Sequence, residues 1–314
     1  MKVALLFPGQ GAQYVGMGKE LYENYLVTKQ IYDEADSLLD WNVKEVCFTD
    51  SNGLIHQTRY TQGALFTTNY GIYAALKEEG IKIDAVLGFS LGEYDAIAAS
   101  EVLSFKEALK LVDLRATYME ECAKATPGGM SAVIGMETEK VYSLCQQISE
   151  QVGSPVTVAN DNCEGQVTVA GTSEALEVAN GLFKEAGAKR VVPLKVSGAF
   201  HSMLMLEAAM KLEAQLTNVQ FKDPMIPIIS NVTASTMNKD EVRENIPLQI
   251  IKGVRFRESI LYLIEQGFDT FIEVGPKTTL SNLVKKISKE VETYHVEDVE
   301  SLKQVIQKVG GTLC

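Results

Sequence analysis

Short apolar runs alternate with stretches of helical periodicity over the first 125 residues. The run KVALLF at 2–7 is apolar apart from its first residue and stops at Pro8 and Gly9, as expected of a buried strand. The same reasoning predicts a helix at 61–80, a strand at 83–88 and helices at 90–100 and 104–123. Alternating strands and helices favour a mostly parallel sheet with helices on its faces.

The pattern changes after the TPGG at 126–129. The predicted elements there are a strand at 130–135, a helix at 137–151, strands at 155–160 and 165–171, a helix at 173–186 and a strand at 189–195. This β-α-β-β-α-β order is typical of a ferredoxin-like unit. Strands at 227–230 and 270–274 and a mostly helical segment at 278–307, with one short strand near 293–296, then continue the first pattern.

These patterns predict an α/β protein in two parts. An α/β-hydrolase-like body with a short parallel sheet would comprise residues 1–125 and 196–314. A ferredoxin-like subdomain at 126–195 would be inserted into it.

Composition and charge narrow the class of protein. The 314 residues include 29 Lys and Arg against 41 Asp and Glu, a net charge of −12. This balance argues against a nucleic-acid-binding protein, which usually presents a basic face. The five cysteines contain no C-x-x-C pair, so we expect reduced thiols. The N-terminal apolar run is too short for a secretion signal, and no apolar stretch approaches a membrane span. We therefore expect a cytoplasmic protein that does not bind membranes.

The sequence GFSLGEY at 88–94 places Ser90 between two glycines, after a predicted strand and before a predicted helix. This context is that of a nucleophile elbow, in which the N–H of the following residue, Leu91, stabilises an oxyanion. The alternative is that Ser90 only caps the helix. The strand–turn–helix context favours the nucleophile.

A nucleophilic serine needs a base, and the chain has three histidines. His56 lies in a predicted turn and His295 in an acidic segment, so both are interpreted as structural or surface residues. His201, in the sequence VSGAFHSM, follows the predicted insertion and lies in a Ser- and Gly-rich loop. This position favours His201 as the base, although a structural role fits it too.

Arg115 lies within the apolar stripe of the predicted helix 104–123. A buried charge requires a partner. Two interpretations remain open: a salt bridge to an acidic residue, or a planar fork that binds a substrate carboxylate.

The glycine-rich sequence FPGQGAQYVGMG at 7–18 follows the first strand. It matches neither the P-loop nor the dinucleotide-binding pattern, so it is a poor phosphate site. Beside the elbow, it could supply a second oxyanion N–H from Gln10. The alternative is a flexible turn.

Together, these features resemble the malonyl-CoA:acyl carrier protein transacylase family over nearly the whole chain. The resemblance rests on FPGQGAQ (7–13), TQGALF (61–66), GFSLGEY (88–94), Arg115 in DLRATYM, GAFHS (198–202), SNVTA (230–234), LQIIKGVRF (248–256) and EVGP (273–276).

The resemblance implies a role for each matching position. Ser90 would carry the acyl group, with His201 as its base and Gln10 and Leu91 as oxyanion donors. The backbone carbonyl of Gln249 would hold His201, replacing the acid of a usual triad.

The resemblance also implies the substrate contacts. Arg115 would bind the malonyl carboxylate, and Gln62 and Asn160 would also bind the substrate. Phe200 resembles the aromatic residue of malonyl-selective relatives, where methylmalonyl-selective ones carry a smaller residue. The alternative for Phe200 is packing in the core that supports His201.

Three positions depart from the family pattern. Phe89 stands where His is frequent, which puts a hydrogen bond beside the nucleophile in doubt. Gly63 replaces a usual Pro, and Lys277 replaces a usual Gly after EVGP.

These observations predict a malonyltransferase of fatty-acid synthesis that uses malonyl-CoA and acyl carrier protein, without metal or cofactor, as a monomer. A stand-alone malonyltransferase of a polyketide synthase has the same chemistry. A serine acyl hydrolase and a non-enzymatic acyl-binding subunit are more distant alternatives. An acidic carrier protein requires a basic patch, and Lys285, Lys286 and Lys289 are candidates for it, although they also fit a solvated helix face.

Overall fold

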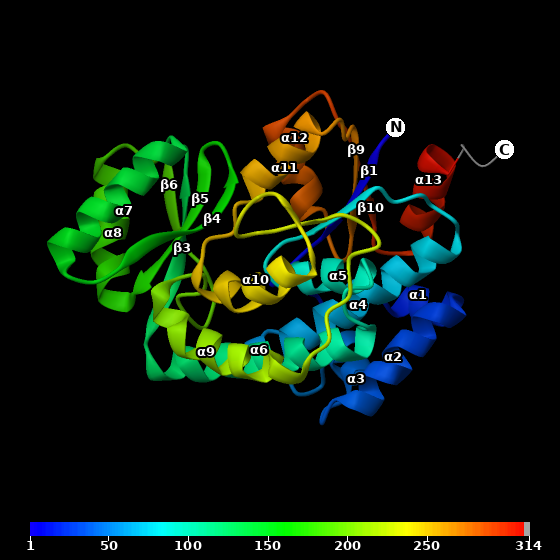
Figure 1. The fold of residues 1–314 in the computed structure, drawn as a ribbon. Coiled ribbons are helices and arrows are strands. Elements are labelled where there is room, and N and C mark those ends of the chain that lie inside the picture. The colour runs from blue at the N-terminus through cyan, green and yellow to red at the C-terminus, as the bar shows by residue number, and fades with distance from the viewer. Residues whose placement is uncertain (311–314) are drawn as a thin grey trace.

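The central element of the computed structural model, which describes residues 1–310, is a six-stranded sheet (Figure 1). Its strands lie in the order β10-β9-β1-β2-β7-β8. All neighbours are parallel except β7 and β8, which pair antiparallel. The mostly parallel sheet is therefore confirmed. The strands are β1 (Val3–Phe7), β2 (Ala85–Gly88), β7 (Ile228–Ile229), β8 (Thr236–Met237), β9 (Thr270–Val274) and β10 (Glu292–Val296).

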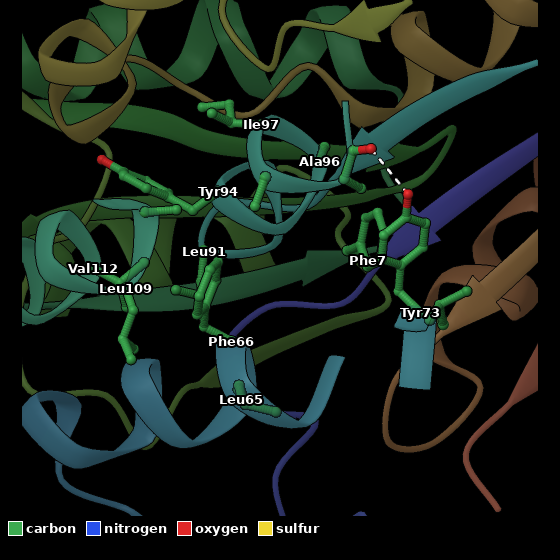
Figure 2. Packing of buried hydrophobic residues seen from close by; sticks show 14 of the residues in the cluster. Phe7, Leu65, Phe66, Tyr73, Leu91, Tyr94, Ala96, Ile97, Leu109 and Val112 are labelled. Carbon is green, nitrogen blue, oxygen red and sulfur yellow. Dashed lines mark hydrogen bonds between the residues drawn. The ribbon is translucent and has the colours of Figure 1, made fainter. Parts of the chain in front are cut away.

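Helices cover both faces of this sheet. Successive side chains of each strand point to opposite sides, so each face contributes to its own apolar cluster. In β1, Leu5 and Phe7 pack into one apolar cluster and Ala4 and Leu6 into another. Figure 2 shows the first cluster, in which the ring of Tyr73 meets Phe7 edge to face at 6.0 Å between ring centres. The second cluster is closed by α11 (Phe256–Glu265) and α12 (Thr279–Ile287).

The remaining helices of this part surround the first cluster and the ends of the sheet. They are α1 (Lys19–Asn24), α2 (Leu26–Leu38), α3 (Val43–Phe48), α4 (Thr58–Glu78), α5 (Gly92–Ala99), α6 (Phe105–Ala125), α9 (Leu206–Gln215), α10 (Lys239–Ile251) and α13 (Val299–Val309), with 3₁₀ turns at Met203–Met205 and Leu216–Asn218.

A second, four-stranded sheet lies beside the first, shown in green in Figure 1. Its strand order is β4-β5-β3-β6, and all of its neighbours are antiparallel. The helices α7 and α8 pack against it in a separate apolar cluster. Along the chain the order is β-α-β-β-α-β, as the sequence predicts: β3 (Gly128–Ile134), α7 (Thr138–Val152), β4 (Val156–Cys163), β5 (Gln166–Thr172), α8 (Ser173–Glu185) and β6 (Arg190–Pro193).

A backbone bridge ties β4 to the segment that leads into α11. Asn160 forms a parallel bridge with Val254, just before α11. The N–H of Asp161 donates to the carbonyl of Val254 at 2.9 Å, and the N–H of Val254 donates to the carbonyl of Ala159 at 2.8 Å. These bonds fix Asn160 next to Val254.

The helix boundaries differ in part from the sequence-based expectations, and the structure also describes the cysteines and the apolar character of the helices. The first predicted helix begins at Thr58 rather than at residue 61, and α1 to α3 were not predicted. Four cysteines are free and buried, and Cys314 lies outside the described residues. No helix among residues 1–310 is both long and apolar enough to cross a bilayer.

Candidate active site

Ser90 occupies a sharp turn between the end of β2 and the start of α5. Its backbone has φ of +52°, a left-handed conformation that is uncommon for residues other than glycine. A Cβ atom on Gly88 would overlap the backbone of Gly92, and one on Gly92 would overlap the carbonyl of Phe7. Both glycines are therefore required for the close passage of strand and helix, as expected of a nucleophile elbow.

His201 faces this serine. Its Nε2 lies 2.7 Å from the Oγ of Ser90, and its Nδ1 lies 2.8 Å from the carbonyl oxygen of Gln249 and 3.2 Å from that of Lys252. Two carbonyl oxygens require the proton on Nδ1, so Nε2 is free to accept the serine proton. Burial, followed by the nearby charge of Arg115, lowers the pKa of His201 to about 4. The imidazole is therefore neutral at physiological pH.

Arg115 projects from α6 into the same site and is 1% exposed. Its Nη1 donates to Oε1 of Gln62 at 2.6 Å, and its Nη2 donates to Oγ of Ser90 at 3.1 Å and to Oε1 of Gln249 at 3.0 Å. Within residues 1–310 no carboxylate forms an ion pair with it. The salt bridge that the sequence left open is therefore absent from the described chain. Burial lowers the pKa of Arg115, but an arginine remains charged.

Two backbone N–H groups lie beside the serine. The glycine-rich loop passes so close to the elbow that a Cβ atom on Gly9 would overlap the carbonyl of Phe89. Gln10 and Leu91 both border the same cavity as Ser90. In the part of the chain that the structure describes, neither residue's backbone N–H donates to another protein group. Both groups are free to stabilise an oxyanion.

A cavity of about 100 Å³ lies over these atoms. It brings together the predicted substrate-contacting residues Gln62, Arg115, Asn160 and Phe200. An adjoining cavity of about 250 Å³ shares Gln10, Phe89, Asn160 and Leu194 with it and extends between the glycine-rich loop, β4, β5 and α12. The residues lining the first cavity are Gln10, Gln62, Phe89, Ser90, Leu91, Arg115, Met119, Met130, Asn160, Leu194, Val196, Phe200 and His201.

The other two histidines lie outside this cavity. His56 is exposed, and its Nδ1 lies 3.3 Å from Nε2 of Gln13. His295 lies on β10 with its Nε2 3.8 Å from a carboxylate oxygen of Glu297. Both positions agree with the structural interpretation.

A family model and curated relatives match nearly the whole chain. The model of the acyl transferase domain covers residues 4–309. The malonyl CoA-acyl carrier protein transacylase of Bacillus subtilis (strain 168) is 43% identical over 307 residues, which cover 98% of this chain and 96% of the relative. The chain belongs to the malonyl CoA-acyl carrier protein transacylase family. A relative of the same name from Staphylococcus aureus (strain MRSA252) is 38% identical, over 96% of this chain and 97% of its own length.

Solved transacylase structures have the same fold. The crystal structure of the enzyme from Streptococcus pneumoniae has a TM-score of 0.93 and 43% identity, covering 98% of this chain and all, 100%, of that one. A malonyl-transacylase solved in complex with a type II polyketide synthase acyl-carrier protein has a TM-score of 0.94 and 33% identity, covering 98% and 100% of the two chains.

The three departures from the transacylase pattern have local explanations. Gly63 lies under Trp41, where an added Cβ atom would be 2.9 Å from the indole ring. Lys277 has φ of +67°, which explains a usual glycine there, and its Nζ donates to the carbonyl of Gly11 at 3.0 Å. The ring of Phe89 packs edge to face against Phe256 at 5.6 Å between ring centres, so this side chain makes an apolar contact beside the nucleophile.

Sequence reasoning missed Asn231 and the acidic residue of the elbow, Glu93. Asn231 accepts from the N–H of Ser90 at 2.8 Å and donates to the carbonyl of Gly88 at 2.6 Å. Both residues lie in the motifs SNVTA and GFSLGEY that carry the family resemblance. A buried acid directly after the elbow was the one available signal.

Proposed function

We propose that this protein transfers a malonyl group from coenzyme A to the phosphopantetheine thiol of acyl carrier protein in fatty-acid synthesis, through an ester on Ser90. One observation carries the proposal: a buried guanidinium, with no carboxylate partner among residues 1–310, and a neutral imidazole both contact the Oγ of Ser90. A hydrolase of neutral esters has no need for the first. A carboxylated acyl group requires both.

The first half-reaction acylates the serine. The Nε2 of His201 takes the proton of Ser90, and Oγ attacks the thioester carbonyl of malonyl-CoA. The oxyanion receives hydrogen bonds from the backbone N–H groups of Gln10 and Leu91. The carbon–sulfur bond then breaks, and the coenzyme A thiolate takes the proton from His201.

The second half-reaction reverses these steps with another thiol. The carrier thiol gives its proton to His201 and attacks the malonyl ester. The bond to Ser90 breaks and Oγ takes the proton back. The chemistry balances without a metal or cofactor, and two half-reactions at one serine imply ping-pong kinetics.

The surrounding residues have supporting roles in this proposal. Arg115 binds the malonyl carboxylate, together with Gln62, and the carbonyl of Gln249 holds the ring of His201. Asn160 borders both cavities and contacts the acyl-pantetheine arm, while Phe200 limits the space beside the α-carbon. The adjoining cavity is the entrance for the arm.

The architecture is proposed as an α/β-hydrolase-like body, residues 1–125 and 196–314, with a ferredoxin-like insertion at 126–195. The antiparallel order β4-β5-β3-β6 supports the insertion. A cytoplasmic location and a monomeric state remain predictions. Light scattering coupled to gel filtration would test the second.

Mass spectrometry of the intact protein tests the function. With malonyl-CoA, we expect one malonyl adduct, which disappears on addition of a holo carrier protein and is absent in Ser90→Ala. Release of free malonate at the rate of acylation would instead indicate a hydrolase. An unchanged mass would indicate a binding protein.

The carrier protein served is a separate question. The solved complex of a similar malonyl-transacylase with a polyketide carrier supports the polyketide synthase alternative. Transfer rates to a fatty-acid carrier and a polyketide carrier, measured side by side, distinguish the two. The proposed docking patch comprises exposed Lys285 and Lys286 in the last turn of α12 and exposed Lys289 just after it. Their charge reversal should slow transfer without affecting acylation.

A further inference from the structure

Glu93 is a buried carboxylate in the first turn of α5, three residues after Ser90, and is 3% exposed. Its Oε1 accepts from the backbone N–H of Asn231 at 2.8 Å, and its Oε2 accepts from Nε2 of Gln249 at 2.5 Å. A protonated carboxyl would need an acceptor, but both of its contacts are N–H donors. The geometry therefore fits an ionised Glu93.

Each of these partners also contacts the backbone of Ser90, and Gln249 contacts Arg115 as well. Nε2 of Gln249 also donates to the carbonyl of Ser90 at 2.6 Å, and its Oε1 accepts from Arg115 at 3.0 Å. Asn231 accepts from the N–H of Ser90. Glu93 therefore contacts Ser90 and Arg115 indirectly, through one intervening side chain in each case. It does not border the cavity itself.

The side-chain amide of Gln249 lies between two opposite charges. Its NH₂ group faces the carboxylate of Glu93, and its oxygen faces the guanidinium of Arg115. Rotating the amide by half a turn would place oxygen against oxygen and donor against donor. The charges on either side therefore determine which way the amide points.

Glu93 also compensates the charge of Arg115. In the described chain, Arg115 has no carboxylate within ion-pair distance, and Glu93 is an acidic group whose field acts on it. Burial raises the pKa of Glu93 to about 7, while its two N–H donors and Arg115 oppose that rise. The substrate's carboxylate would then enter a site in which the guanidinium is already held in place.

We propose that Glu93 is a positioning residue for substrate selection: it orients the Gln249 amide, which holds Arg115 ready for the substrate carboxylate. This inference rests on the proposed malonyl transfer. It predicts a loss of discrimination between malonyl-CoA and acetyl-CoA, because only malonyl has a carboxylate for Arg115.

Glu93→Gln is the first test. The backbone N–H of Asn231 continues to donate to the oxygen of the new side-chain amide, so the NH₂ group of that amide faces Gln249. The amide of Gln249 would then turn over to present its oxygen to this NH₂ group, and its own NH₂ group would face Arg115. We expect the ratio of kcat/KM for malonyl-CoA to that for acetyl-CoA to fall at least about tenfold, mainly through a higher KM for malonyl-CoA. Equal losses for both donors, as general loosening would produce, would overturn the inference.

Glu273→Gln is the matched control. Glu273 is also buried, and its oxygens accept from the N–H groups of Leu280 and Ser281 at 2.9 and 2.8 Å. None of these three residues borders the cavity over Ser90. This variant should keep the donor ratio of the unmodified protein. A similar fall in its ratio would show that the effect is not specific to Glu93, and would overturn the inference.

A double-mutant cycle tests the route of the effect. If Glu93 acts through Arg115, Glu93→Gln should not change the ratio further in an Arg115→Ala background. Additive losses would contradict that route. Should Glu93→Gln fail to fold, Glu93→Asp provides the same comparison: its shorter carboxylate should lower the ratio less, and equal losses for both donors would again refute the inference. Failure of the unmodified protein to form a malonyl adduct would instead refute the proposed function.

Discussion

The guanidinium of Arg115 donates a hydrogen bond to the hydroxyl of Ser90 over 3.1 Å. The same Nη2 also donates to Gln249, while Nη1 donates to Gln62. These bonds use three of the five N–H donors of the guanidinium, and within residues 1–310 its Nε has no hydrogen-bond partner. Free donors therefore remain for a substrate carboxylate without loss of the bond to Ser90.

Replacing Arg115 by Ala should reduce malonyl transfer at least tenfold, since a buried charged hydrogen bond contributes about 1.5–3 kcal/mol. Acetyl transfer should be affected less or should increase. Lys should restore malonyl transfer poorly, because it lacks the planar fork. The measurement is acylation of Ser90 by each donor, with the surface variant Arg59→Ala as control. A malonyl rate unchanged in Arg115→Ala would exclude the carboxylate contact.

Replacing His201 by Ala should slow acylation by about 10² to 10⁴, the usual contribution of a general base. Single-turnover acylation measures this effect. His56→Ala and His295→Ala serve as matched controls and should keep the normal rate, because neither ring borders the cavity. Inactivity of a control variant together with activity of His201→Ala would identify a different base.

The pH dependence of acylation should reflect the low pKa of His201. Burial and then Arg115 lower that pKa from 6.5 to about 4, so the imidazole stays neutral and able to accept a proton above pH 4. In Glu93→Gln, where the neighbouring carboxyl cannot titrate, we expect a loss of acylation only as the pH falls toward 4. Rapid-quench rates for the unmodified protein and Glu93→Gln separate this titration from that of the neighbouring carboxyl. A midpoint near 6.5 in both would contradict the assignment.

Replacing Phe200 by Ser should shift donor preference toward methylmalonyl-CoA. Phe200 is 6% exposed, borders the cavity over Ser90 and belongs to the first apolar cluster of the large sheet. One methyl group in a tight pocket discriminates by about 1–3 kcal/mol, so we expect a changed preference rather than a complete reversal. Competition between the two donors measures it. An unchanged ratio in an active variant would leave Phe200 with a packing role only.

The elbow could be predicted from sequence because its determinants are local. Two glycines, the strand before them and the helix after them lie within a short stretch, and the overlaps at Gly88 and Gly92 explain each requirement. The β-α-β-β-α-β order of the elements from β3 to β6 was predictable for a similar reason, since the periodicities change at TPGG.

The rest of the site depends on contacts between distant segments. Gln249 is 159 residues from the serine whose carbonyl it contacts, and Asn231 is 141 residues from the same serine. Their roles came from family resemblance or were missed. For Arg115, periodicity predicted burial but left the partner open, because only the folded chain reveals whether a carboxylate is near.

The small volume over Ser90 limits the length of the acyl group. The cavity volume of about 100 Å³ is well below the roughly 300–1,000 Å³ of most small-molecule sites. A three-carbon diacid fills such a space, whereas a fatty acyl chain would project back into the entrance and obstruct the arm that carries it. Long-chain thioesters would therefore be poor donors, so the products of chain elongation should not occupy the enzyme that supplies its building block.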